Sequence, residues 1–214
     1  MPSVFPLGIE ETILDFLAED DPRHSALRKC SLVCRSFLHM CRKHIFGSIV
    51  LNYDYQYKGS SSCWYFTTRA FGCLLRETPE IADYIHNIQI INRGPINNLA
   101  AIQKSLQRIS KVECLTVRYN HFQRLEWRNI PTCPALLHLL HLPTLTHFKV
   151  AGIKDFVVSD LIPCVNLKYL DISDCTTVAA ENTFPAAFPE HSIKLNEFIA
   201  RFKLGRTAGI IRKT

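Results

Sequence analysis

One short pattern recurs along the second half of the chain and constrains its fold. It reads apolar-x-x-apolar-x-apolar, where x is any residue, and it occurs clearly four times and more weakly a fifth time: 85–90, 112–117, 145–150, 167–172 and 195–200. The alternation at the end of each segment predicts a strand with one buried side. Between the segments, apolar residues at helical spacing occupy 99–109 and 135–142. Strand-and-helix units cannot bury their apolar sides alone, so the pattern predicts units stacked into a parallel sheet with one open, concave face.

The x positions of these segments are expected to face outward on the open side of the sheet. Such a surface is where repeat proteins bind their partners. We predict that a protein substrate contacts eight of these side chains: His86, Gln89, Glu113, Thr116, His147, Lys149, Tyr169 and Asp171. The sequence does not identify that substrate.

The first fifty residues carry a helical pattern instead. Ile9, Ile13, Phe16 and Leu17 are spaced as i, i+4, i+7 and i+8, which places them on one side of an α-helix. Pro6 lies just ahead of this helix, where proline is tolerated. The sequence therefore begins with a short amphipathic helix.

Two more helices and a strand are predicted to follow. The second helix spans 25–33, and the third ends at Gly47, where glycine stops it. Residues 49–51 are apolar and predict a short strand. A polar loop at 52–63, which contains the Tyr-rich run 53–57, leads into another helical stripe at 66–75.

Residues 5–51 resemble the F-box, the helical module by which a protein docks on the Skp adaptor of a cullin–RING ubiquitin ligase. The resemblance rests on the opening FPLGIEETILDFL and on VCR at 33–35 followed by an aromatic residue. It implies a three-helix module with an apolar docking surface. The matching positions, which include residues of the module's own core, are Phe5, Pro6, Leu7, Ile9, Glu10, Ile13, Leu14, Leu17, Leu32, Val33, Cys34 and Phe37.

Three positions depart from the usual F-box residues. Phe5 replaces the leucine of the opening Leu-Pro, and Phe37 replaces a tryptophan, so both keep an apolar side chain. Gly8 stands where a proline or an acidic residue is common, and a glycine within a helix costs up to about 1 kcal/mol.

Residues 81–200 resemble the degenerate leucine-rich repeats that follow the F-box in large families of mushroom-forming fungi. The two resemblances imply an α/β fold with four parts: an N-terminal three-helix F-box (1–51), a linker with a bridging helix (52–80), a partial leucine-rich-repeat-like α/β solenoid with a parallel sheet (81–200) and a basic tail (201–214).

The same resemblances imply a function without catalysis. The chain is expected to be the substrate-recognition subunit of a Skp-cullin-F-box ubiquitin ligase, with a Skp-type adaptor and a cullin scaffold as partners. The alternative is a leucine-rich-repeat binding module whose F-box does not dock.

Patterns for catalysis and metal binding are weak. The sequence has no Gly-rich phosphate loop, no G-x-S-x-G and no H-E-x-x-H. Two groups of residues invite a metal interpretation, but they fit core thiols and surface histidines better: His39, Cys41 and His44 near Cys30 and Cys34, and His138, His141 and His147. We expect no cofactor, no metal and no enzyme activity.

Charge and cysteine content bear on partners and location. The net charge is +6, and residues 201–214 hold five bases and no acid. Because a short basic segment favours nucleic acid only weakly, a nucleic-acid-associated protein is a further, less favoured alternative. Nine scattered cysteines suit buried thiols in the cytosol or nucleus. No apolar run is long enough to predict a membrane-spanning helix.

Overall fold

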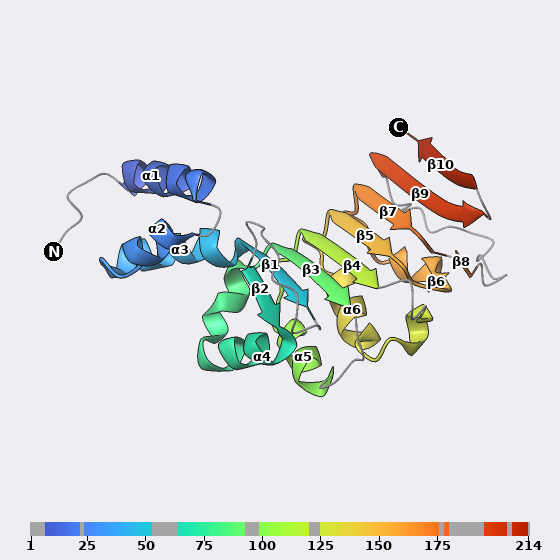
Figure 1. Ribbon diagram of the computed structural model, residues 1–214, viewed down its shortest axis with the longest axis horizontal. Coiled ribbons are helices and arrows are strands. Elements are labelled where there is room, and N and C mark those ends of the chain that lie inside the picture. The colour runs from blue at the N-terminus through green and yellow to red at the C-terminus, as the bar shows by residue number, and fades with distance from the viewer. Residues whose placement is uncertain are drawn as a thin grey trace.

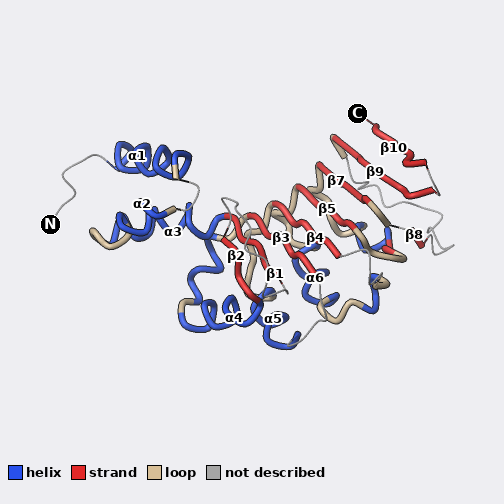
Figure 2. Tube along the Cα trace, viewed as in Figure 1, coloured by secondary structure: helices blue, strands red, loops and turns tan. Residues whose placement is uncertain are grey.

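The computed structural model describes residues 7–21, 24–52, 64–92, 99–119, 125–175, 178–179, 195–204 and 207–213. Three helices at the N-terminal end precede a long sheet, and further helices cover one side of that sheet (Figure 1; Figure 2). The predicted α/β class with a parallel sheet is confirmed.

The three N-terminal helices are α1 (Leu7–Asp20), α2 (Ser25–Cys30) and α3 (Arg35–Gly47). They were all predicted, but α2 is three residues shorter than expected. The N–H groups of Leu32 and Val33 donate to carbonyl groups only three residues back, so the chain tightens into a turn after Cys30.

Seven strands form a parallel sheet. In spatial order they are β2 (Trp64–Thr67), β1 (Ser48–Asn52), β3 (Asn87–Asn92), β4 (Cys114–Tyr119), β5 (His147–Ala151), β7 (Tyr169–Ser173) and β9 (Glu197–Leu204). From β3 to β9, each strand of this sheet lies beside the one that precedes it in sequence, as stacked units require.

The recurring pattern sets the register of the sheet. The second apolar residue of each segment lies beside its counterparts in the neighbouring strands, in the order Ile88, Leu115, Phe148, Leu170 and Phe198. The first apolar residue of each clear segment is buried just before its strand begins, namely Ile85, Val112, Leu145 and Leu167. All five predicted strands are present, and each begins two residues after the first residue of its segment.

The sheet begins at Ser48, not at residue 81 as predicted. β1 pairs with β3 and buries Ile49 and Leu51 in the same core as the later strands. Phe46, Ile49 and Leu51 carry the recurring pattern too, and the long interval before the next segment hides it in the sequence. β2 then adds outside β1, so residues 64–67 of the predicted linker belong to the sheet.

Most of the predicted basic tail, 201–214, lies in strands. β9 extends to Leu204, and β10 (Thr207–Lys213) pairs with it antiparallel. β10 thereby provides backbone hydrogen-bond partners for the outer edge of β9, which a parallel sheet would otherwise leave open.

The described helices that follow α3 lie on one side of the sheet (Figure 1). They are α4 (Thr68–Glu77), α5 (Leu99–Leu106) and α6 (Cys133–Leu140), with the short 3₁₀ helices η1 (Pro79–Tyr84), η2 (Trp127–Asn129) and η3 (Val158–Leu161). A separate two-stranded pairing joins β6 (Phe156–Val157) to β8 (Val178–Ala179). The helices bury Phe71, Leu106 and Leu136 against the inward side chains of the strands.

Gly152 provides a direct test of this packing. It has a positive φ of 74°, and a Cβ atom there would lie against the backbone carbonyl of Tyr119, well inside van der Waals contact. We expect Gly152→Ala to lower the free energy of unfolding by at least about 2 kcal/mol, because both the left-handed backbone and the clash oppose a side chain. Urea unfolding measures this.

Gly72→Ala is the matched control. Gly72 lies within α4, and a Cβ there would be 3.6 Å from Ser105 Oγ, an ordinary contact. Alanine in a helix is about 0.5–1 kcal/mol more favourable than glycine, so this variant should be at least as stable as the parent chain. If Gly152→Ala unfolds at the same urea concentration as the parent, the close approach of residues 119 and 152 is incorrect.

Candidate interaction surfaces

Large apolar side chains are exposed on the N-terminal helices. Phe16, Leu32 and Val33 are 63%, 85% and 71% exposed, and Ile9 and Ile13 are about half exposed. We call these five residues the helical apolar surface. Apolar groups of this size usually lie in a core or an interface, so the surface suits coverage by another molecule.

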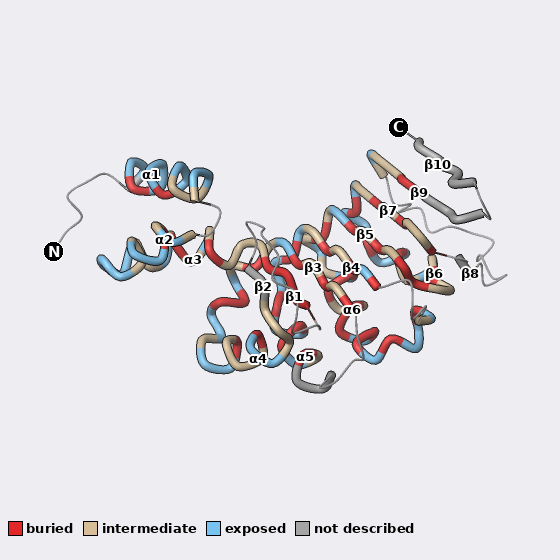
Figure 3. The backbone as a smooth tube through the Cα atoms, viewed as in Figure 1, coloured by how far each residue is buried: buried red, intermediate tan, exposed pale blue. Residues whose placement is uncertain are grey.

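The core of the helical unit is complete without these side chains. Leu14, Leu27, Cys41 and Ile45 are buried together, and Leu17 packs against them. Figure 3 shows the buried positions of α1 on the side that faces α2 and α3. The helix therefore has two apolar stripes, one used for its own core and one left in solvent.

The twelve predicted adaptor contacts divide accordingly. Ile9, Ile13, Leu32, Val33 and Cys34 are exposed, whereas Leu14 is buried and Leu17 and Phe37 are partly buried in the core. The side chains of Phe5, Pro6 and Leu7 lie outside the described residues.

Glu10 corrects the prediction, and Phe16 adds to it. Glu10 was expected on the contact surface, but it is only 4% exposed because it shares the inward stripe of α1 with Leu14 and Leu17. Phe16 was not among the predicted contacts, although it is the most exposed large apolar residue among the described side chains of α1. Its spacing from Ile9 and Ile13 was the signal that could have identified it.

The turn at 31–34 lies at the end of the helical unit farthest from the sheet (Figure 2). Cys34 occupies the position just before α3. The Ser36 hydroxyl, 3.1 Å from Sγ, and the backbone N–H of Phe37 lower the pKa of Cys34, while the nearby Glu10 carboxylate opposes this.

Thiol reactivity tests this placement. Burial raises the pKa of Cys41 to about 11, that of Cys164 to about 12 and that of Cys175 to about 11. Because the thiolate is the reactive form, iodoacetamide at neutral pH should alkylate exposed Cys34 well before those three in the folded chain. Peptide mapping by mass spectrometry measures the order of labelling.

Denaturant supplies the control for that experiment. In urea the cysteines should react at similar rates, since burial no longer distinguishes them. Alkylation of Cys164 as fast as Cys34 in the native chain would contradict the burial described above.

The open face of the sheet carries the second candidate surface. Gln89, Thr116, Lys149 and Asp171 are direct neighbours across β3, β4, β5 and β7 and form one row. His147 and Tyr169 lie side by side in the adjacent row. These six predicted substrate contacts are thus brought together on one face by the register of the strands.

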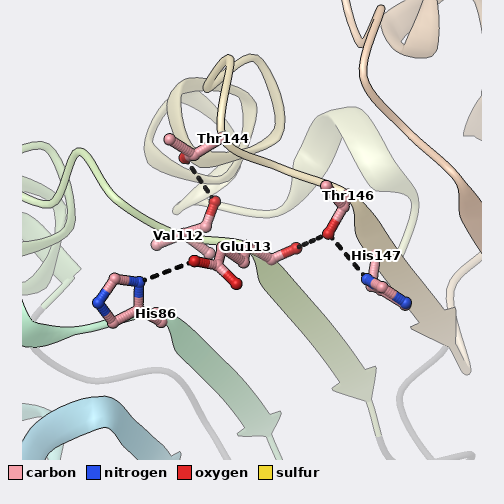
Figure 4. A network of polar contacts seen from close by, with 6 residues as sticks. All are labelled: His86, Val112, Glu113, Thr144, Thr146 and His147. Carbon is pink, nitrogen blue, oxygen red and sulfur yellow. Dashed lines mark hydrogen bonds and ion pairs between the residues drawn. The ribbon is translucent and has the colours of Figure 1, made fainter.

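The other two predicted contacts lie elsewhere. His86 and Glu113 come just before β3 and β4, and they bond to each other, with His86 Nδ1 3.1 Å from Glu113 Oε1 (Figure 4). The His86 carbonyl accepts hydrogen bonds from the N–H groups of Glu113 and Cys114. The Glu113 carbonyl accepts from Thr146 and His147 in the same way. The backbone carbonyl groups of His86 and Glu113 therefore link successive strands, while their side chains are partly exposed to solvent.

An aromatic pair lies on the open face where β5 and β7 begin. The Thr146 hydroxyl donates to the Glu113 carbonyl at 3.2 Å, so at 2.8 Å it accepts from Nδ1 of His147 (Figure 4). The His147 ring stacks on Tyr169 with centroids 5.7 Å apart. Lys149 Nζ lies 5.0 Å from the centroid of the same Tyr169 ring. The surface is thus preorganised and combines charge with an aromatic plane.

The histidines considered for metal binding have separate partners. His44 lies 3.1 Å from Asp15, and His39 bonds to the Tyr84 hydroxyl. His138 and His141 lie within hydrogen-bond distance of backbone carbonyl groups. Within the described ranges, no three side chains of His, Cys, Asp or Glu gather as metal ligands.

No protein-family model, no curated protein and no solved structure matches the chain. The helices of the described ranges include none with the length and apolar character needed to span a bilayer. Function must therefore be argued from the two surfaces themselves.

Proposed function

We propose that the chain is the substrate-recognition subunit of a Skp-cullin-F-box ubiquitin ligase. The helices α1–α3 act as an F-box that docks on a Skp-type adaptor, and the strands from β3 to β9 act as degenerate leucine-rich repeats that hold a target protein. The observation that carries this proposal is the helical apolar surface, which remains exposed beside a complete core.

The exposed side chains suit docking on an apolar groove of the adaptor. Burying a side chain such as leucine, valine or phenylalanine contributes about 1.5–3 kcal/mol, so five of them support a stable complex. Their positions agree with the F-box resemblance at Ile9, Ile13, Leu32 and Val33, and Phe16 extends the same stripe of α1.

The mechanism is proximity rather than chemistry by this chain. Docking places the open face of the sheet, with its bound target, near the ubiquitin-conjugating enzyme carried by the cullin scaffold. The effective concentration of the target's lysines then rises without a catalytic group in the recognition subunit. The cytosol and the nucleus are the compartments where this proposal expects the chain.

Adaptor binding tests the proposal. We expect the full chain to bind a purified Skp-type adaptor, and the double variant Leu32→Asp plus Val33→Asp to bind at least about 100-fold more weakly, because two charges would enter an apolar interface. Both side chains are largely exposed, so thermal unfolding of the variant should match that of the parent. Isothermal titration calorimetry measures the affinity.

Ile162→Asp plus Val165→Asp is the matched control. These apolar residues are also exposed, but they lie near η3 on the sheet unit. This variant should bind the adaptor as the parent does. A folded parent chain that ignores the adaptor would instead favour the binding module with a non-docking F-box.

A further inference from the structure

Two opposite charges on the open face are neighbours but do not neutralise each other. Lys149 and Asp171 are direct cross-strand partners on β5 and β7. No salt bridge joins them, because the ammonium group of Lys149 leans toward the Tyr169 ring instead. Within the described part of the chain, Oδ1 of Asp171 is buried and receives no hydrogen bond. A buried carboxylate oxygen without a hydrogen bond costs stability, and the charge of Asp171 is left without a partner among the described residues.

The separation of these charges has a defined direction. Tyr169 and Asp171 are two residues apart on β7, which is roughly 6.6 Å along a strand. The ammonium group lies over the Tyr169 ring, so a ligand that pairs with both charges would reach from Tyr169 to Asp171 along β7, as side chains i and i+2 of an extended peptide can.

We propose that the open face binds an extended peptide segment with one acidic and one basic residue two positions apart. The acidic side chain pairs with Lys149, and the basic side chain donates to Asp171. The stacked rings of His147 and Tyr169 support the segment between them. This inference rests on the part of the proposed function that gives the open face to the target, and it names the chemistry of that target.

The charge pattern disfavours a polyanion as the ligand. A polyanion such as nucleic acid would meet Lys149 favourably but would be repelled by Asp171, its immediate neighbour. A ligand with both charges satisfies both residues. The side chain of His147 is already oriented by Thr146, so it loses little conformational entropy when a ligand binds.

A random linear peptide library displayed on phage, selected against the full chain, tests the inference. We expect enrichment of peptides with Asp or Glu two positions from Lys or Arg. Lys149→Gln should abolish the enrichment of acidic residues, and Asp171→Asn that of basic residues. A synthetic peptide from the selection should bind each variant about tenfold more weakly than the parent, and more weakly still at high salt.

Lys111→Gln and Asp83→Asn are the controls. These exposed residues form an ion pair with an N–O distance of 3.7 Å, and they precede β4 and β3 instead of lying on the strands. Both should select the same peptides as the parent. Failure to enrich the charged pair, or enrichment that survives both Lys149→Gln and Asp171→Asn, would overturn the inference. Adaptor binding by Lys149→Gln and Asp171→Asn should be unchanged, so a failure of docking is distinguishable from a failure of this site.

Discussion

The fold depends on the alignment of apolar side chains across its parallel strands. From β3 to β9, each strand of the large sheet places its inward residues beside those of its neighbours, as Ile90, Val117 and Val150 do. A slip of one residue would turn the row that contains Lys149 and Asp171 into the core. The carbonyl groups just before the strands reinforce this register, since those of Thr146 and Lys168 each accept two N–H groups from the next segment.

The helical unit is joined directly to the sheet. α3 ends at Gly47 and β1 begins at the next residue, so no loop separates the helical unit from the sheet. Arg42 also bonds to Glu80 of η1 at 3.1 Å, and His39 bonds to Tyr84. These contacts hold α3 against η1, and through them a partner on the helices would be placed at a fixed distance from a target on the open face.

The sequence predicted the sheet better than its boundaries or its surfaces. Apolar spacing predicts the strands because inward residues such as Phe148 must meet their neighbours, whatever lies between them. The same spacing could not place the start of the sheet, since the interval after Leu51 differs from the later ones. It also could not separate Ile13 from Leu14, because both are apolar and only packing against α2 and α3 decides which is buried. The bond between His86 and Glu113 forms because β3 and β4 begin side by side, and a local sequence pattern does not show which strands are neighbours.

Hydrogen exchange of the full chain, with and without a purified Skp-type adaptor, tests the central claim most directly. We expect the adaptor to slow exchange in α1 and around the turn at 31–34, and to leave exchange in the strands from β3 to β7 unchanged. Exchange that stays the same throughout, or protection confined to the sheet, would contradict the assignment of the helical apolar surface to docking.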